Sequence, residues 1–76
     1  MKYQEAIRKY RANKNMSLDA LGEILGVTKQ AISQWEHGIT TPDKEWLLNN
    51  GTTSNSKSEF CRVVLAALYP NVNIEA

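Results

Sequence analysis

Cysteine is almost absent from this sequence of 76 residues, which contains only Cys61. A single cysteine excludes an internal disulfide framework and a cysteine-based zinc site, and it fits a reducing compartment. A domain of this size buries only about 60% of the surface that its unfolded chain exposes, so its stability is marginal and association with a second copy would help. We expect Cys61 to be a small buried hydrophobe rather than a reactive nucleophile.

Long apolar segments are absent as well. The longest apolar run covers residues 63–69, which is too short to span a bilayer. The start, MKYQEAIRKY, lacks the apolar core of a signal peptide. We therefore expect a soluble, cytoplasmic protein with no membrane segment.

The parts of an enzyme are missing too. The one histidine, His37, has no carboxylate at helical spacing beyond Glu36, and Cys61 lies in an apolar stripe. No Gly-rich phosphate loop and no metal-ligand spacing occurs. We expect a protein that is not an enzyme and holds no cofactor and no metal.

A strong net charge is also lacking, since the formal value is +1. The charge is unevenly distributed, because residues 1–30 sum to +3 and residues 31–76 sum to −2. A basic N-terminal half is compatible with a side that faces phosphates, and equally with an ordinary solvated mixture of charges.

The apolar residues that are present recur at helical spacing, beginning with Tyr3, Ile7 and Tyr10. They predict a first helix at about 2–13, with Asn15 as a left-handed C-terminal cap. Ser17 is expected to cap a second helix over 17–25, which Gly26 ends.

Thr28 is expected to cap a third helix over 28–37, with Ala31, Ile32 and Trp35 facing inward and Gly38 at its end. Thr41-Pro42 predicts the start of a fourth helix, which Gly51 closes.

Ser56 and Glu59 form a capping-box pattern for a fifth helix over 57–69, which Pro70 ends. Its buried residues should be Phe60, Val63, Val64, Ala67 and Leu68. The expected fold is all-α, a compact five-helix domain over residues 1–70, followed by a tail at 71–76 that is a short strand or frayed.

The helices at 17–25 and 28–37, joined around Gly26, have the spacing of a helix-turn-helix. Such a second helix can enter the major groove of DNA and present its polar side chains to base edges. The positions of helix 28–37 that do not face the core are Lys29, Gln30, Ser33, Gln34 and His37. Composition alone would favour a plain solvated surface, whereas the flanking pattern favours a base-reading face.

Residues 7–42 resemble the helix-turn-helix of the Cro and phage-repressor type, the XRE family. The resemblance lies in "IRKYRANKNMS", "LGEILGVTKQAISQWEHG" and "TTP", which agree with the family in order and spacing. It implies a repressor-like domain that binds double-stranded DNA.

The resemblance also implies a role for individual residues. It implies base contacts at Lys29, Gln30 and Gln34, with Ser33 as a further candidate. It implies phosphate contacts at Thr28, His37, Thr40 and Ser17, and a structural ion pair between Arg11 and Glu36.

Four features depart from the family pattern. Leu18 stands where Gln is usual, Gly22 where Ala is usual, and Ile24 where a polar residue is usual. The segment EWLLNNGT also comes only a few residues after Pro42, which leaves helix 57–69 unexplained by the motif. That helix closes the core of the monomer, contacts a second copy through Phe60, Val64 and Leu68, or does both.

The leading functional hypothesis is a sequence-specific transcriptional regulator, of the phage repressor or Cro kind. It would bind an inverted repeat as a homodimer, with half-sites about one helical turn apart. The alternative is an interaction module of the antitoxin or anti-repressor type, in which the C-terminal helix holds a regulatory protein partner.

Overall fold

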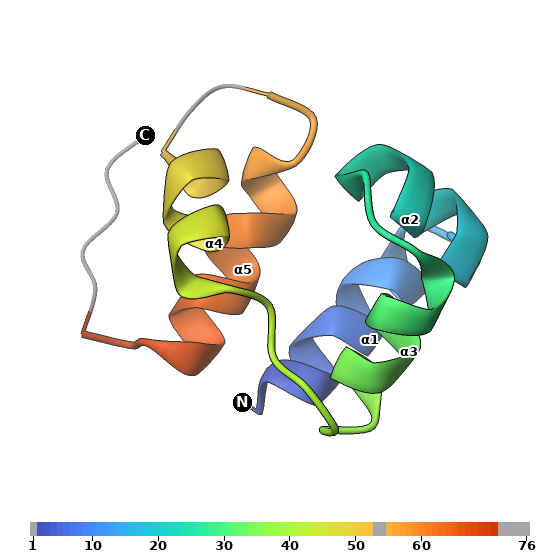
Figure 1. The fold of residues 1–76 in the computed structure, drawn as a ribbon, viewed down its shortest axis with the longest axis horizontal. Helices are drawn as coiled ribbons and strands as arrows, with labels where there is room; N and C mark the ends of the chain where they lie inside the picture. The colour runs from blue at the N-terminus through green and yellow to red at the C-terminus, as the bar shows by residue number, and fades with distance from the viewer. Residues whose placement is uncertain (1, 53–54, 72–76) are drawn as a thin grey trace.

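Five α-helices follow one another in the part of the chain that the computed structural model describes, residues 2–52 and 55–71 (Figure 1). They are α1 Tyr3–Asn13, α2 Leu18–Leu25, α3 Lys29–Glu36, α4 Lys44–Gly51 and α5 Ser58–Leu68. The described residues contain no strand, which confirms the all-α class. Of the expected tail, residues 72–76 lie outside the described residues.

The ends of α1 and α2 are set by left-handed backbone, as expected. Asn15 has a φ of 53° just after α1, and Gly26 has a φ of 72° at the end of α2. Asparagine and glycine adopt this conformation more readily than other residues. The chain can therefore reverse direction at both places without strain.

The start of α4 differs from the expectation. The N-cap is Asp43, whose Oδ2 accepts a hydrogen bond from the Trp46 N–H at 3.0 Å. Thr41 is therefore not the cap, and Pro42 lies before the helix and is buried. A carboxylate at the N-cap both accepts this bond and complements the positive end of the helix dipole.

The boundaries on either side of the following loop also differ. Gly51 is the last residue of α4 and is buried, so the helix ends one residue later than expected. The α5 helix begins at Ser58, and its N-cap Lys57 makes no side-chain capping bond. The capping box on Ser56 does not form, because the N-cap position is Lys57, and Ser58 Oγ donates to the Asn55 carbonyl at 2.9 Å.

The core lies where α5 meets α1 and α4, with α3 and α2 completing it. Figure 1 shows α4 and α5 side by side, while α1 packs on α5, α3 on α1, and α2 on α3. Trp35 is buried and stacks on Phe60 at 6.3 Å between ring centroids, while Tyr10 meets Phe60 edge-on at 5.4 Å. The buried apolar residues are Ala6, Ile7, Leu21, Leu25, Ile32, Trp35, Leu47, Phe60, Cys61, Val64 and Leu65.

The two alternatives for the C-terminal helix are separated by its burial. Phe60 and Val64 are 0% exposed, and Leu68 is partly buried against the core. The helix thus closes the monomer, and Phe60 and Val64 have no surface with which to contact a second copy. Val63, expected to be buried, is 38% exposed because α1 and α4 cover other faces of the helix.

Cys61 is buried, as expected from the apolar stripe. Burial raises the pKa of its thiol to about 11. A thiol needs to ionise to become a nucleophile, so Cys61 stays protonated and unreactive near neutral pH.

The helices of the described part are all too short or too polar to cross a membrane.

Candidate nucleic-acid interface

The α2 and α3 helices meet at close range at Gly22. A Cβ atom at this position would lie 2.7 Å from the Val27 carbonyl oxygen, closer than two such atoms can approach. The Val27 N–H donates to the Gly22 carbonyl at 3.0 Å, which fixes the turn between the helices. The missing side chain thus allows the turn to fold against α2.

The α3 helix has one buried and one exposed face. Ile32, Trp35 and Glu36 are buried. Around the opposite side, four of the five expected positions are exposed and Ser33 is half-buried. The exposed residues are Lys29, Gln30, Gln34 and His37. The structure thus places the long polar side chains together on one outward face.

The starts of α2 and α3 offer hydrogen-bond donors to an anion. Ser17 Oγ accepts from the Ala20 N–H at 3.0 Å, and Thr28 Oγ1 accepts from the Ala31 N–H at 3.2 Å. Each hydroxyl uses its oxygen for this cap, so its O–H proton is left to donate outward. Ser17 and Thr28 are both exposed, next to the first free N–H groups of their helices.

Three side chains form hydrogen bonds around the C-terminal end of α3, and not all of these bonds were predictable from sequence spacing. His37 Nδ1 lies 2.7 Å from the Ser33 carbonyl, so this nitrogen carries the proton and donates it. Thr40 Oγ1 donates to Gln34 Oε1 at 3.5 Å. Tyr3, on α1, donates its hydroxyl proton to the Thr40 carbonyl at 3.0 Å.

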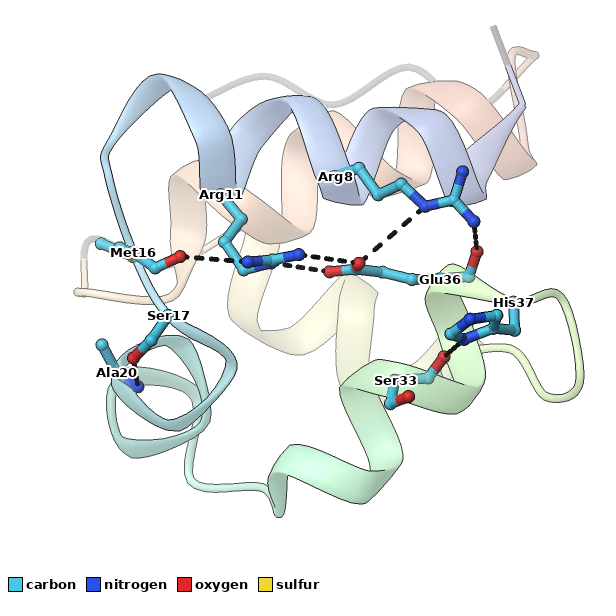
Figure 2. A network of polar contacts seen from close by, with 8 residues as sticks. All are labelled: Arg8, Arg11, Met16, Ser17, Ala20, Ser33, Glu36 and His37. Atoms are coloured by element: carbon cyan, nitrogen blue, oxygen red, sulfur yellow. Dashed lines mark hydrogen bonds and ion pairs between the residues drawn. The ribbon is translucent and has the colours of Figure 1, made fainter.

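The expected ion pair ties α1 to the end of α3, as Figure 2 shows. Arg11 binds the Glu36 carboxylate through two bonds, Nε to Oε2 at 2.9 Å and Nη2 to Oε1 at 3.0 Å. The hydrogen bond to Glu36 raises the pKa of Arg11. Arg11 Nη1 also donates to the Met16 carbonyl at 3.3 Å, which connects the pair to the start of α2.

Arg8 is a second cation at this site, which was not predicted from the sequence. Its Nε lies 3.9 Å from Glu36 Oε1, and its Nη2 donates to the Glu36 backbone carbonyl. Arg8 is three residues before Arg11, so both lie on the same face of α1. This spacing of three residues is the signal in the sequence that could have identified Arg8.

Two of the residues that depart from the family pattern, Leu18 and Ile24, are half-buried against the core. Leu18 therefore packs inward at the start of α2, where the family usually offers a glutamine to DNA. No group of three or more histidine, cysteine or acidic side chains that could hold a metal ion occurs among the described residues.

Comparison with protein families gives one match. The family model for helix-turn-helix domains of the Cro/C1 type matches residues 7–47, which is more than half of the chain. Neither the curated proteins nor the solved structures contain a match. The chain therefore belongs to the Cro/C1-type helix-turn-helix family, also called the XRE family, whose domains are DNA-binding regulators.

Proposed function

We propose that this protein is a sequence-specific transcriptional regulator that binds an inverted repeat as a homodimer, with α3 in the major groove. The observation that carries the proposal is the exposed polar face of α3, since the starts of α2 and of α3 also each carry an exposed capping hydroxyl. In this arrangement phosphate contacts fix the position of the helix and the side chains of α3 read the bases.

The base contacts are assigned to the exposed side chains of α3. Lys29 can donate to the guanine acceptors N7 and O6, and Gln30 can pair with adenine through both atoms of its amide. Gln34 lies one turn further along the same face. Ser33 is half-buried within the same face and is a further candidate for a base contact.

The phosphate contacts are assigned to hydroxyl, ring and backbone donors around that face. Ser17 and Thr28 donate their free O–H groups, together with the first N–H groups of α2 and α3. His37 uses Nδ1 for the Ser33 carbonyl, so only its Nε2 is available to DNA. Thr40 uses its hydroxyl for Gln34, so its phosphate contact would come from its backbone N–H.

We expect a homodimer because the DNA interface of one copy is small. One short helix reads only a few base pairs, and a two-fold dimer reads the same sequence twice, as an inverted repeat. Such a regulator acts in the cytoplasm by covering promoter DNA.

The test is selection of bound duplexes from a random DNA library by the purified protein at near-physiological salt. We expect an inverted repeat with half-sites about 34–36 Å apart. Gln30→Ala should lose about 1–3 kcal/mol of discrimination at one base pair of each half-site. Asn13→Ala, an exposed change on α1, is the matched control and should select the wild-type sequence.

Two results would refute these assignments. Protein that is folded by circular dichroism but enriches no sequence contradicts DNA recognition by α3. An equal loss of affinity for all sequences in Gln30→Ala would make this residue a phosphate contact.

A second candidate function, binding of a regulatory protein partner, is favoured by a groove between α1 and α5. One section of about 310 Å³ is lined by Ala6, Val63, Ala66 and Ala67. It adjoins a section of about 440 Å³, which shares Ala6 and Val63 and whose charged lining residues are Lys9, Lys14 and Glu59. Lys14 and Glu59 form an ion pair at 3.2 Å, so Lys9 is the remaining charge of this lining. Small apolar residues beside this lysine suit a partner helix that has an apolar ridge and an acidic residue at one flank.

This second function is separable from DNA binding, because the groove residues lie outside α3. Val63→Lys should leave the affinity for the selected operator unchanged. If a partner is needed, the same variant loses repression of a reporter gene placed behind that operator. Full repression by Val63→Lys would show that the groove serves no partner in regulation.

A further inference from the structure

We propose that Thr40 determines which base Gln34 selects, because it holds the carboxamide oxygen of Gln34 and leaves the NH₂ group to read the DNA. This inference rests on the proposed function, since it requires α3 to enter the major groove. It assigns to Thr40 a positioning role that acts through Gln34.

The contact between the two side chains comes from the turn that follows α3. The Ile39 N–H donates to the Gln34 carbonyl at 2.9 Å, which folds the chain back along the end of the helix. Thr40 then lies beside the Gln34 side chain and donates its hydroxyl proton to Oε1 at 3.5 Å. Both residues are exposed, so the pair lies at the surface that faces DNA in the proposed complex.

Thr40 is in turn held from α1. Its carbonyl accepts from the Tyr3 hydroxyl at 3.0 Å, and the Tyr3 side chain packs against the core. Gly38 turns the chain with a φ of 72°, and a Cβ there would lie 2.7 Å from Gln4 Nε2. The first turn of α1 thus covers the turn after α3 and limits where Thr40 can move.

The chemistry of the carboxamide gives this contact a consequence for sequence recognition. Adenine is read by an amide that uses both its oxygen and its NH₂, whereas guanine N7 and O6 and thymine O4 are all acceptors. With Oε1 turned toward Thr40, Gln34 directs its NH₂ group to the bases and is no longer aligned to place both amide atoms on adenine, while guanine offers this donor two acceptors and thymine offers one. It should therefore select guanine or thymine, unlike Gln30, whose amide has no hydrogen bond within the described residues and can pair with adenine.

The experiment is duplex selection with a set of matched variants. Gln34→Ala identifies the base pair that Gln34 reads, as the position at which preference is lost. We expect wild type to select guanine or thymine there. Thr40→Val, which keeps the shape and removes the hydroxyl, should shift that position toward adenine by on the order of tenfold in relative affinity. Thr40→Ser keeps a hydroxyl and should retain the wild-type preference.

Further variants test how Thr40 is held. Tyr3→Phe retains the ring but loses the bond to the Thr40 carbonyl, so it should shift the same position by a smaller factor. Two variants serve as matched controls: Thr41→Val for Thr40→Val, and Tyr69→Phe for Tyr3→Phe. Both controls should select the wild-type operator. A purely structural role for Thr40 would instead weaken binding to all sequences without changing any base preference.

The outcomes separate this inference from the proposed function. An enriched operator with adenine or cytosine at the Gln34 position in wild type overturns the inference alone. The same holds for an unchanged preference, or a uniform loss of affinity, in Thr40→Val. If folded wild-type protein enriches no duplex, the proposed function fails and this inference fails with it.

Discussion

Glu36 is the residue on which the attachment of α3 most depends. It is buried, and its carboxylate is bound by Arg11 through two hydrogen bonds, with Arg8 close to the same oxygen. Transfer of a carboxylate out of water is costly unless cations and hydrogen bonds compensate it. Arg11 and Arg8 supply this compensation from α1, so the ion pair also fixes the orientation of the recognition helix.

Loss of Arg11 should therefore destabilise the fold strongly. We expect Arg11→Met to lower the free energy of unfolding by about 3 kcal/mol, the low end of the range for a broken buried pair, since Arg8 remains beside Glu36. The measurement is urea denaturation followed by circular dichroism.

The double variant Arg11→Met/Glu36→Met serves as the control. It removes both charges, so it should be more stable than Arg11→Met alone. A single variant as stable as wild type would show that the pair contributes nothing to folding.

Because of Cys61, we expect the free energy of unfolding to fall at high pH. The folded thiol has a pKa of about 11 against an ordinary value of 9.0, so between these two values the unfolded chain loses a proton that the folded chain keeps. Stability is therefore complete below about pH 9 and falls as the pH rises toward 11. Burial and the nearby Glu59 carboxylate also raise the pKa of Tyr10, which acts in the same direction.

The corresponding measurement compares the free energy of unfolding at pH 8 and pH 10.5. We expect a fall on the order of 1–3 kcal/mol in wild type, and a smaller fall in Cys61→Ala, where only Tyr10 contributes. An equal fall in the two proteins would exclude Cys61 as the cause. The folded wild type should also resist iodoacetamide at pH 8 and react once unfolded.

At the scale of elements, the crossing of α2 and α3 depends on the absence of a side chain at Gly22. Alanine, usual here in the family, would gain about 1 kcal/mol of helix propensity. Its Cβ, however, would lie 2.7 Å from the Val27 carbonyl, a backbone atom that cannot move without shifting the turn. We expect the clash to outweigh the propensity, so that Gly22→Ala lowers the melting temperature.

The next residue provides a control for this variant. Glu23 is exposed on the same helix, so Glu23→Ala changes a side chain without adding a backbone contact. Its melting temperature should stay close to that of wild type. An increase in melting temperature in Gly22→Ala would mean that the turn relaxes at little cost.

The helix starts show where sequence reasoning succeeds and where it does not. Ser17 and Thr28 are predicted as caps because each is a good capping residue just before an apolar periodic run, and the structure confirms both. Before α4 the sequence predicts Thr41, but the structure uses Asp43, which lies two residues further along. Before α5 it predicts Ser56, but the N-cap is Lys57, whose side chain makes no capping bond. Local patterns cannot rank neighbouring candidates, because packing of the following helix decides which residue lies at its end.

The Asp43 cap leads to a further prediction at this scale. Asp43→Ala removes the acceptor for the Trp46 N–H and should cost about 1 kcal/mol of stability, as measured by urea denaturation. Thr41→Ala removes the residue that the sequence favoured and should cost much less. The reverse order would place the functional cap at Thr41.

The candidate site, like the helix starts, could be predicted from the sequence only in part. Helical periodicity was enough to identify the outward residues of α3, because residues 29, 33 and 37, and likewise residues 30 and 34, recur four positions apart. The contacts of Thr40 with Gln34 and with Tyr3 join residues 6 and 37 positions apart. Neither separation places two residues side by side on one face of a helix. Such contacts arise from how α1 and the turn after α3 are placed by the core, which no local pattern encodes.

For the whole molecule, the arrangement of charge predicts how salt acts on DNA binding. Most of the phosphate donors assigned to the interface are neutral, namely the hydroxyls of Ser17 and Thr28 and backbone N–H groups. Only lysine and arginine contacts release condensed counterions. Lys29 is the one lysine on α3, while Lys9 and Lys14 line the groove between α1 and α5.

We therefore expect a shallow dependence on salt. A dimer with two to four charged contacts should lose roughly 10- to 150-fold in operator affinity between 50 and 200 mM salt, against about 10³–10⁵ for a protein with six to ten such contacts. Titrations at several salt concentrations give the slope directly. Lys9→Ala should leave that slope unchanged, because Lys9 lines the groove between α1 and α5 and is not part of α3. A loss above about 10³, or a shallower slope in Lys9→Ala, would mean that DNA also reaches the α1 side and that the interface is larger than the outward face of α3.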